Sequence, residues 1–384
     1  MTLAFLLNMA FSTVPTPLYT LYAARDNFSN LTVTYIYAVY AVGVIGSLFL
    51  GGHLSDWVGR RTVLVPALIV NVVSSVVFVV WPSLTGLIVA RVISGISVGL
   101  TTATATAYLA ELYRAARPGA PVQRAQTLAT VANIGGIGFG ALAAGLLAEY
   151  APAPLRTPYI VFGVAIAAVA LVVLVTPETV DRTSRPYRPQ RVAVPRAARG
   201  TFYAATATGI AAFSVFGLFT SLVPVFLATA MREPSRAVAG AVAFAAFATG
   251  AAVQVVLGRW APRTMLARSL PILTVGLVLF TVGLRLPNLA VFVIGGMVTG
   301  AGAALAFRAA MTTAALSAPP ESRAEVLAGY FLGGYIGLSL PVVGLGLATQ
   351  YWPARDAVVV FEILALLTCV VAVRYLLRGP RTTA

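Results

Sequence analysis

The stretch Gly52-His53-Leu54-Ser55-Asp56-Trp57-Val58-Gly59-Arg60-Arg61 lies between two long apolar segments of a chain in which only 10% of residues are charged. Charges and glycines so close to apolar segments of this length are costly inside lipid. At the membrane surface the charges stay hydrated and the glycines permit a tight reversal. The stretch therefore predicts a short surface loop that joins two membrane-spanning helices.

The composition of the whole chain indicates its class before any other motif is considered. Hydrophobic residues make up 59% of the 384 residues and the mean hydropathy is +0.91, which leaves too little polar surface to cover a water-soluble globule. A spanning helix needs about 20 apolar residues, and with its loop each span takes about 30. We therefore expect an all-α integral membrane protein with twelve transmembrane helices.

Proline, glycine and charged residues mark the breaks between these spans. The first span is too long for a signal peptide, so we expect it to remain in the mature protein. The predicted spans are 2–24, 31–54, 62–82, 84–112, 124–149, 157–176, 201–230, 237–258, 265–286, 289–315, 324–350 and 356–377.

The arginines predict the orientation of the chain. With a cytoplasmic N-terminus, the inner loops and the C-terminal tail hold eighteen arginines and the outer loops hold six, so the positive-inside rule places both termini in the cytoplasm. All 26 basic residues are arginine, which is typical of a GC-rich bacterial genome, and we expect the bacterial cytoplasmic (inner) membrane. The net charge of +15 does not indicate a nucleic-acid partner, because no soluble domain offers a contiguous basic surface.

An internal duplication divides the chain into two halves. The stretch 124–129, RAQTLA, aligns with 323–328, RAEVLA, and Gly95 and Gly99 of span 4 align with Gly296 and Gly300 of span 10. We therefore expect an N-terminal six-helix bundle over 1–176, a basic cytoplasmic linker over 177–200 and a C-terminal six-helix bundle over 201–384. Repeated halves with a path between them are the architecture of a secondary transporter, here expected to be a monomer.

The linker 177–200 carries six arginines. Their attraction to anionic lipid, about 1 kcal/mol for each near the surface, is enough to hold the linker at the membrane. A regulatory docking site is the alternative interpretation of the same charge.

Two motifs resemble those of a known family, the major facilitator superfamily. Its loop between spans 2 and 3 has the pattern Gly-x-x-x-Asp-x-x-Gly-Arg-Arg or Lys, and its span 4 carries an arginine followed by glycines at four-residue steps. The matching residues here are Gly52, Asp56, Gly59, Arg60 and Arg61 in the loop, and Arg91, Gly95 and Gly99 in span 4. The resemblance implies two pseudo-symmetric six-helix bundles that work by alternating access.

The same resemblance implies that the loop is a cytoplasmic gate. Asp56 would face the start of span 11 near Ala324, where a helix N-terminus presents about half a positive charge, and would hold the two halves together when the inner side is closed. Arg60 and Arg61 would pair with Glu111 at the inner end of span 4. The alternative is a loop that turns tightly and only follows the positive-inside rule.

Span 5 bears on the direction of transport. Its glycine-rich segment resembles a stretch of the superfamily's proton-coupled exporters, but Ala141 stands where those proteins have a helix-kinking proline. A seam of small residues for close helix packing is the alternative interpretation. The glycines expected to pack in this way are Gly136, Gly140 and Gly145.

Three charged residues lie well inside predicted spans, away from the span ends: Arg91, Arg308 and Glu362. Each needs a reason, because a charge at mid-membrane costs about 2.5 to 3.5 kcal/mol. Arg91 matches the family's span 4 arginine, which implies proton coupling or anion binding; a structural interhelical pair is the alternative. Arg308 is a binding residue or a cytoplasmic anchor that snorkels, and Glu362 is a proton carrier, an ion-pair partner or a lipid-facing carboxyl.

The remaining candidates for a binding pocket are aromatic or uncharged. Such an apolar cavity suits a lipophilic drug or metabolite, and Arg91 favours an anionic one. We therefore expect proton-coupled efflux, with uptake of a small organic solute by a symporter or facilitator as the alternative. One cysteine and one histidine offer no catalytic or metal-binding constellation, so we expect neither an enzyme nor a cofactor. The pocket candidates are Asn8, Tyr37, Tyr40, Asn133, Phe213 and Phe216.

Overall fold

The computed structural model describes residues 1–119, 121–181, 187, 189–319 and 322–378. Within these ranges every regular element is helical, and eleven helices are long and apolar enough to span a membrane. The predicted all-α membrane fold is therefore confirmed. Part of the predicted linker, 182–186 and 188, lies outside the described residues.

The first half of the chain forms a bundle around a short first span. Its elements are α1 (Thr2–Phe11), η1 (Thr16–Leu18), α2 (Tyr19–Asp26), α3 (Asn30–Gly51), α4 (Ser55–Val58), α5 (Arg60–Val80), α6 (Leu84–Ala116), α7 (Val122–Thr130), η2 (Val131–Gly135), α8 (Gly136–Tyr150) and α9 (Thr157–Leu174).

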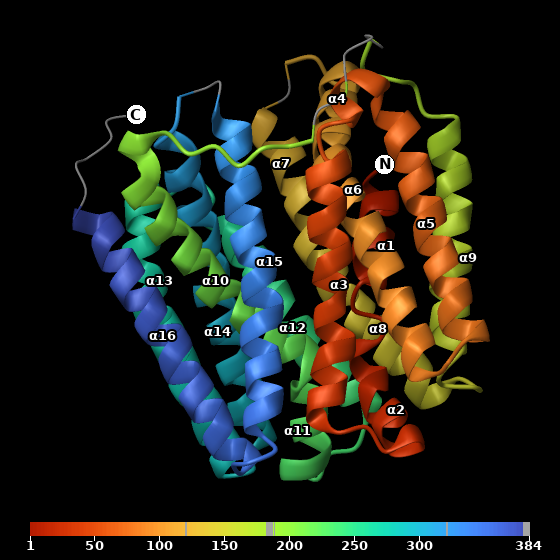
Figure 1. Cartoon of the computed structure of the whole chain (residues 1–384), viewed down its shortest axis with the longest axis vertical. Helices are drawn as coiled ribbons and strands as arrows, with labels where there is room; N and C mark the ends of the chain where they lie inside the picture. Colours follow the sequence, from red (N-terminus) through yellow and green to blue (C-terminus); the bar gives the residue numbers. More distant parts are fainter. Residues whose placement is uncertain (120, 182–186, 188, 320–321, 379–384) are drawn as a thin grey trace.

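The second half repeats this arrangement. Its elements are η3 (Arg196–Ala198), α10 (Arg199–Ser221), α11 (Val223–Ala230), α12 (Arg236–Val256), α13 (Pro262–Arg285), α14 (Leu289–Leu316), α15 (Arg323–Ala348) and α16 (Ala354–Arg378). Figure 1 shows the two groups of helices side by side, red to yellow-green and green to blue.

The first predicted span, 2–24, is interrupted in the structure. It breaks after α1 and resumes as η1 and α2, because Pro15 and Pro17 supply no backbone N–H and their rings exclude a regular helix through this segment. The predicted span 201–230 breaks similarly into α10 and α11, with Pro224 near the start of the second piece. Both breaks lie beside the interface of the two halves.

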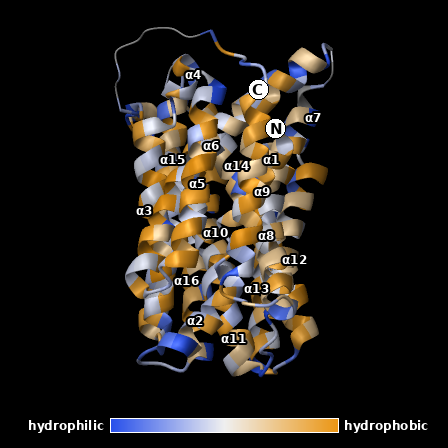
Figure 2. Ribbon diagram, turned by 90° about the vertical axis from the view of Figure 1, so that its right-hand side faces the viewer, coloured by the Kyte–Doolittle hydropathy of each residue, from blue (hydrophilic) through white to orange (hydrophobic). Residues whose placement is uncertain are grey.

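The two ends of the molecule are named here by their landmarks. The α4 turn, the start of α1 and the end of α16 lie at one end, the upper end in Figure 1, and α2 and α11 lie at the other. We call these the α4 end and the α2 end. Figure 2 shows hydrophilic residues gathered at both ends and hydrophobic residues between them.

The middle of the bundle exposes large apolar side chains on its outer surface. Val164 and Leu171 on α9 are 65% and 67% exposed, and Val371 on α16 is 69% exposed. A water-soluble protein would bury many of these side chains, so this belt fits contact with lipid tails. The multi-pass membrane placement expected from composition therefore agrees with the surface of the structure.

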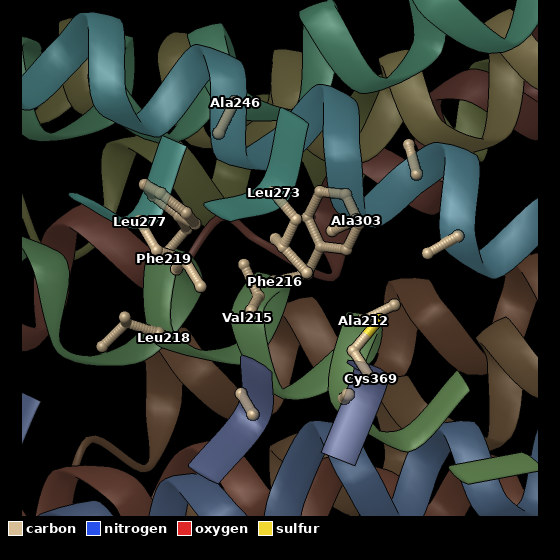
Figure 3. Packing of buried hydrophobic residues seen from close by; sticks show 14 of the residues in the cluster. Ala212, Val215, Phe216, Leu218, Phe219, Ala246, Leu273, Leu277, Ala303 and Cys369 are labelled. Atoms are coloured by element: carbon tan, nitrogen blue, oxygen red, sulfur yellow. The ribbon is translucent and has the colours of Figure 1, made fainter. Parts of the chain in front are cut away.

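The interior of the second half packs around α10. Figure 3 shows Phe216 and Phe219 of this helix among Leu273 and Leu277 of α13. The single cysteine, Cys369, is fully buried beside this core and is not part of a disulfide. The structure thus places it as a small apolar residue.

Candidate transport cavity

A cavity of about 590 Å³ lies between the two halves. Its walls come from the first-half elements α1, α3, α6 and η2 and from the second-half helices α10, α12, α14 and α15. Its polar and charged lining residues are Ser12, Thr13, Tyr37, Tyr40, His53, Asp56, Arg91, Thr102, Thr106, Thr130, Asn133, Gln190, Thr220, Gln254 and Tyr335.

The cavity is closed toward the α2 end by contacts between the halves. The amide of Asn30 donates to Thr349 Oγ1 at 3.2 Å, and Ser339 Oγ donates to the carbonyl of Ala38 at 3.2 Å. Glu149 at the end of α8 pairs with Arg236 at the start of α12. These bonds hold α3 against α15 and α8 against α12 at this end.

Toward the α4 end the cavity widens between residues that make no such bonds in the described part of the chain. Gly52, His53 and Asp56 line one side, and Ala324 and Leu327 of α15 line the other. Hydrogen bonds that join the two bundles at Thr16, Asn30, Tyr37, Glu149 and Ser339 lie nearer the α2 end. The conformation is therefore open to the α4 end and closed to the α2 end.

Arg91 of α6 lies in the wall of this cavity and is only 1% exposed. Its Nη1 donates to the carbonyl of Ser12 at 2.7 Å and its Nη2 to the carbonyl of Tyr37 at 3.2 Å. The guanidinium carbon lies 4.5 Å from the ring centroid of Tyr40 and 5.5 Å from that of Tyr37, which is cation–π distance. Two carbonyls and two aromatic faces hold the charge, and its Nε has no partner in the described structure.

The break in the first span supplies one of these carbonyls. In a continuous helix the carbonyl of Ser12 would accept from the N–H of Thr16, but that N–H bonds to Thr13 instead, and Pro15 has no N–H to offer. The freed carbonyl stands at the C-terminal, partially negative end of α1. Arg91 thus satisfies a helix end that the prolines expose.

Glycines bring α6 close enough for this contact. A Cβ on Gly95 would overlap the carbonyl of Tyr40, and one on Gly99 would lie 2.7 Å from the carbonyl of Val44. The helices α3 and α6 therefore touch backbone to backbone, as small-residue seams allow. This close approach positions Arg91 over the rings of Tyr37 and Tyr40.

Aromatic rings from four helices form the wall of the second half. The ring of Phe213 on α10 lies 4.7 Å from Phe307 on α14 and 5.8 Å from Tyr335 on α15. The ring of Phe216 lies 4.7 Å from that of Phe247 on α12. All five line the cavity, so the cavity has Arg91 on one side and a largely aromatic wall on the other.

A charge network occupies the α4 end of the first half. Arg60 pairs with Glu111 of α6, Nη2 to Oε1 at 2.9 Å, and with Asp56 one turn earlier. Asp56 therefore bonds within its own half instead of to the start of α15, and its side chain is 62% exposed. The predicted contact with the start of α15 belongs to the closed conformation, so the open mouth seen here does not test it.

The second predicted arginine bonds differently from the expectation. Arg61 donates to the carbonyls of Leu174 and Thr176 at 3.0 and 3.2 Å and not to Glu111. The remaining partner of Glu111 is Thr179, whose Oγ1 donates to it at 2.6 Å. The network thus joins α5 and α6 to the start of the linker.

Glu178, a residue with no assigned role in the sequence analysis, completes this network. Its carboxylate accepts the backbone N–H groups of Arg60 and Arg61 at 2.8 and 3.1 Å and so caps the N-terminus of α5. Gly59 precedes the helix at φ 115°, a conformation that favours glycine, and a Cβ there would lie 2.6 Å from the Glu178 carboxylate.

Comparison with known proteins decides the family. The sequence profile of the Major Facilitator Superfamily matches residues 1–284. This chain belongs to the major facilitator superfamily. It is therefore a membrane transporter, and the interface cavity is its candidate path.

Solved structures share the whole fold of the transporter at low identity. The human organic anion transporter TETRAN superposes with a TM-score of 0.69 and 17% identity, covering 97% of each chain. A bacterial homologue of the human lysosomal transporter Spinster, inward-facing and unoccupied, superposes with a TM-score of 0.75 and 15% identity. The match covers 100% of this chain and 97% of that chain. A D-xylose-proton symporter superposes with a TM-score of 0.75 and 15% identity, covering 97% of this chain and 95% of that chain.

One curated relative is also similar in sequence. The D-xylose-proton symporter-like 2 protein of Arabidopsis thaliana is 29% identical over 116 residues, which is 30% of this chain and 23% of that protein. The chain thus aligns with about a quarter of that relative's length.

Three of the residues predicted to bind cargo or protons in the transporter lie outside the cavity lining. Asn8 is fully buried and bonds to Thr101, Asn71 and Ser97 between α1, α5 and α6. It is therefore an interhelical link within the first bundle.

Arg308 and Glu362 also serve contacts between helices. Arg308 donates to the carbonyls of Gln254 and Gly258 and so caps the C-terminal end of α12, a favourable site for a cation. Glu362 of α16 is 5% exposed and accepts from Thr281 of α13, while its Oε1 has no partner in the described structure. Neither lines the cavity.

The glycines of α8 pack against two neighbours. A Cβ on Gly136 would lie 2.7 Å from the carbonyl of Leu6, and one on Gly140 would overlap the carbonyl of Ala10, both on α1. On the other side Gly145 meets the carbonyl of Arg236 at the start of α12. This geometry favours the packing interpretation of span 5.

Of the predicted pocket residues, Tyr37, Tyr40, Asn133, Phe213 and Phe216 do line the cavity. Sequence reasoning missed several aromatic partners, although two of them stand four residues apart on one helix face, a spacing that indicates a shared surface. The missed aromatic residues are Phe49, Phe247, Phe307, Phe331 and Tyr335.

Proposed function

We propose that the transporter carries a lipophilic small molecule with a carboxylate or similarly negative group, and that it exports this cargo in exchange for protons. The observation that carries the proposal is the electrostatic state of Arg91. Among the described residues no acid pairs with it, and carbonyls and rings alone hold its charge. A buried cation without a counter-ion is costly, and a negatively charged cargo would supply that counter-ion.

The rest of the lining supports a lipophilic cargo. The wall opposite Arg91 is made of aromatic side chains, and the amide side chains in the lining are Asn133, Gln190 and Gln254. A volume of about 590 Å³ suits a drug-sized molecule. A sugar site would call for a denser set of Gln, Asn and Trp side chains than the three amides of this lining.

The orientation and direction of transport rest on the arginine distribution. The α4 end carries most of the loop arginines, so we assign it to the cytoplasm, and the open cavity then faces the compartment from which an exporter loads. Movement of the two halves about the cavity would close this end and open the other. Asp56 would then meet the start of α15 and hold the inner mouth shut.

Proton-coupled uptake is the second candidate. Its support is the likeness to D-xylose-proton symporters in fold and over part of the sequence, together with Ala141 in place of the exporters' proline. In either direction a proton-coupled cycle needs an acid that titrates, and we assign this role to Glu362, whose buried carboxyl has one oxygen without a partner.

Binding to the purified transporter tests the cargo class. We expect a lipophilic carboxylate to bind and to raise the thermal unfolding temperature. Its neutral amide should bind about 10 to 100-fold more weakly and so cause a smaller rise, because a hydrogen bond to a charged group contributes about 1.5–3 kcal/mol. Arg91→Gln should remove this preference, whereas Gln254→Leu, another lining residue, should retain it. Equal binding of acid and amide by the unaltered protein would refute the proposal.

Transport in vesicles with an imposed pH gradient tests the direction. An exporter accumulates cargo in inside-out vesicles that are acid inside, and Glu362→Gln should abolish this accumulation while cargo exchange continues. Accumulation only in right-side-out vesicles that are acid outside would establish uptake.

A further inference from the structure

A groove of about 680 Å³ lies on the outer surface of the second half, between the beginning of α10 and the end of α16. It is separate from the transport cavity. The residues that line it are Gly200, Tyr203, Ala204, Ala207, Leu367, Thr368, Val371, Ala372 and Tyr375.

The groove combines an apolar floor with aromatic edges. Its floor is formed by alanines and by Val371 and Leu367, which are 69% and 55% exposed. Tyr203 and Tyr375 are 64% and 55% exposed on its two sides, and tyrosines of this kind sit at the headgroup level of a membrane. The two helices meet closely at Gly200, where a Cβ would overlap the Tyr375 hydroxyl.

Cations continue both sides of the groove toward the α4 end. Arg196 stands in η3, directly before α10. Arg378 follows Tyr375 by three residues, so helical periodicity places it on the groove side of α16. Arg199 directly precedes Gly200 and Arg374 directly precedes Tyr375, and all four arginines are exposed. No acid occurs in 196–207 or 367–378, and these four side chains have no hydrogen bond or ion pair within the described structure.

We propose that this groove binds one anionic phospholipid of the surrounding membrane, with an acyl chain along the alanine floor and the phosphate between Arg196 and Arg378. The occupant follows from the charge pattern, because an apolar channel that ends in unpaired cations matches a lipid with a negative head. A neutral or zwitterionic lipid leaves those cations without a counter-charge. The site also anchors the end of the linker, since η3 and α10 begin beside it.

Native mass spectrometry of the purified transporter tests this site with phosphatidylglycerol and, for comparison, phosphatidylcholine. We expect one saturable phosphatidylglycerol site, and about 30-fold weaker binding in the Arg196→Gln/Arg378→Gln double variant, from the usual contribution of a surface arginine at an anionic membrane. The matched control is Arg114→Gln, an exposed arginine at the α4 end of α6. It should bind like the unaltered protein.

A second variant separates the groove from general surface charge. Thr368→Trp places a large ring in the channel at an exposed position, so it should weaken binding of the lipid without affecting the fold. Unchanged phosphatidylglycerol binding in both variants would overturn the proposal. So would a dimer that Thr368→Trp dissociates, because the groove would then be an interface between two copies.

Discussion

At the scale of single residues, position in the fold determines what each charged group can do. Arg91 and Arg308 are both arginines inside spans, yet Arg91 lines the cavity and Arg308 caps the end of α12. The difference lies in the neighbouring helix ends, because each guanidinium bonds at least one carbonyl that a helix terminus leaves free, Ser12 for Arg91 and Gln254 for Arg308. The sequence predicts that such charges need partners, but which helix end they meet depends on tertiary packing.

Gly59 allows a prediction at this scale. Gly59→Ala is expected to lower the free energy of unfolding by about 2–3 kcal/mol, because φ 115° is strained for a residue with a Cβ and because the added carbon displaces Glu178 from the N-terminus of α5. Thermal unfolding in detergent measures the change.

Gly119→Ala is the matched control for that substitution. Gly119 also has a positive φ, 87°, but a Cβ there meets nothing within 4 Å. Gly119→Ala should therefore lower the free energy of unfolding only by the cost of a positive φ for a residue with a Cβ, about 1 kcal/mol. Equal losses in the two variants would show that Glu178 contributes no cap.

At the scale of elements, the sequence predicted most helices but missed the interruption between α10 and α11. Hydrophobic length and charged breaks placed the spans because a helix must cross about 30 Å of hydrocarbon. Pro15 and Pro17 predict the interruption of the first span, but the sequence does not show which neighbour satisfies the backbone groups that the prolines free. Arg91 is that neighbour, and it lies 79 residues away from Ser12.

The packing of α8 on α1 gives a prediction for an element. Gly140→Ala should destabilise the transporter by several kcal/mol and reduce its yield in the membrane, because the new carbon overlaps the backbone carbonyl of Ala10 and the helices must separate. Gly46→Ala in α3 is the control, since nothing lies within 4 Å of its added carbon. A normal yield for Gly140→Ala would show that close packing of α8 on α1 at this position is not required for folding.

At the scale of the whole molecule, the two-bundle fold and the cavity between its halves follow from the internal duplication. The composition of the cavity was predicted in part: Tyr37, Tyr40, Phe213 and Phe216 face it, whereas Asn8 does not. Periodicity identifies a shared helix face but cannot tell a face that lines a path from one that packs within a bundle. That distinction depends on which helices flank the interface, and this is a property of the complete fold.

The position of Asp56 leads to a prediction about the motion of the two halves. In the open conformation this carboxylate is 62% exposed and pairs with Arg60, so Asp56→Asn should change thermal stability by about 1 kcal/mol or less. The same substitution should slow transport strongly, because the closed inner mouth would lose the contact between Asp56 and the N-terminus of α15.

Cross-linking separates this role from a general loss of fold. Cysteines at His53 and Leu327, on opposite sides of the mouth, should react with a short bifunctional reagent only when the α4 end closes, in a background with Cys369→Ala. We expect Asp56→Asn to slow this reaction without changing the reaction of cysteines at Asn30 and Thr349, which touch in the open conformation. If Asp56→Asn impairs transport but leaves cross-linking between positions 53 and 327 unchanged, Asp56 acts in the cargo path and not in the gate.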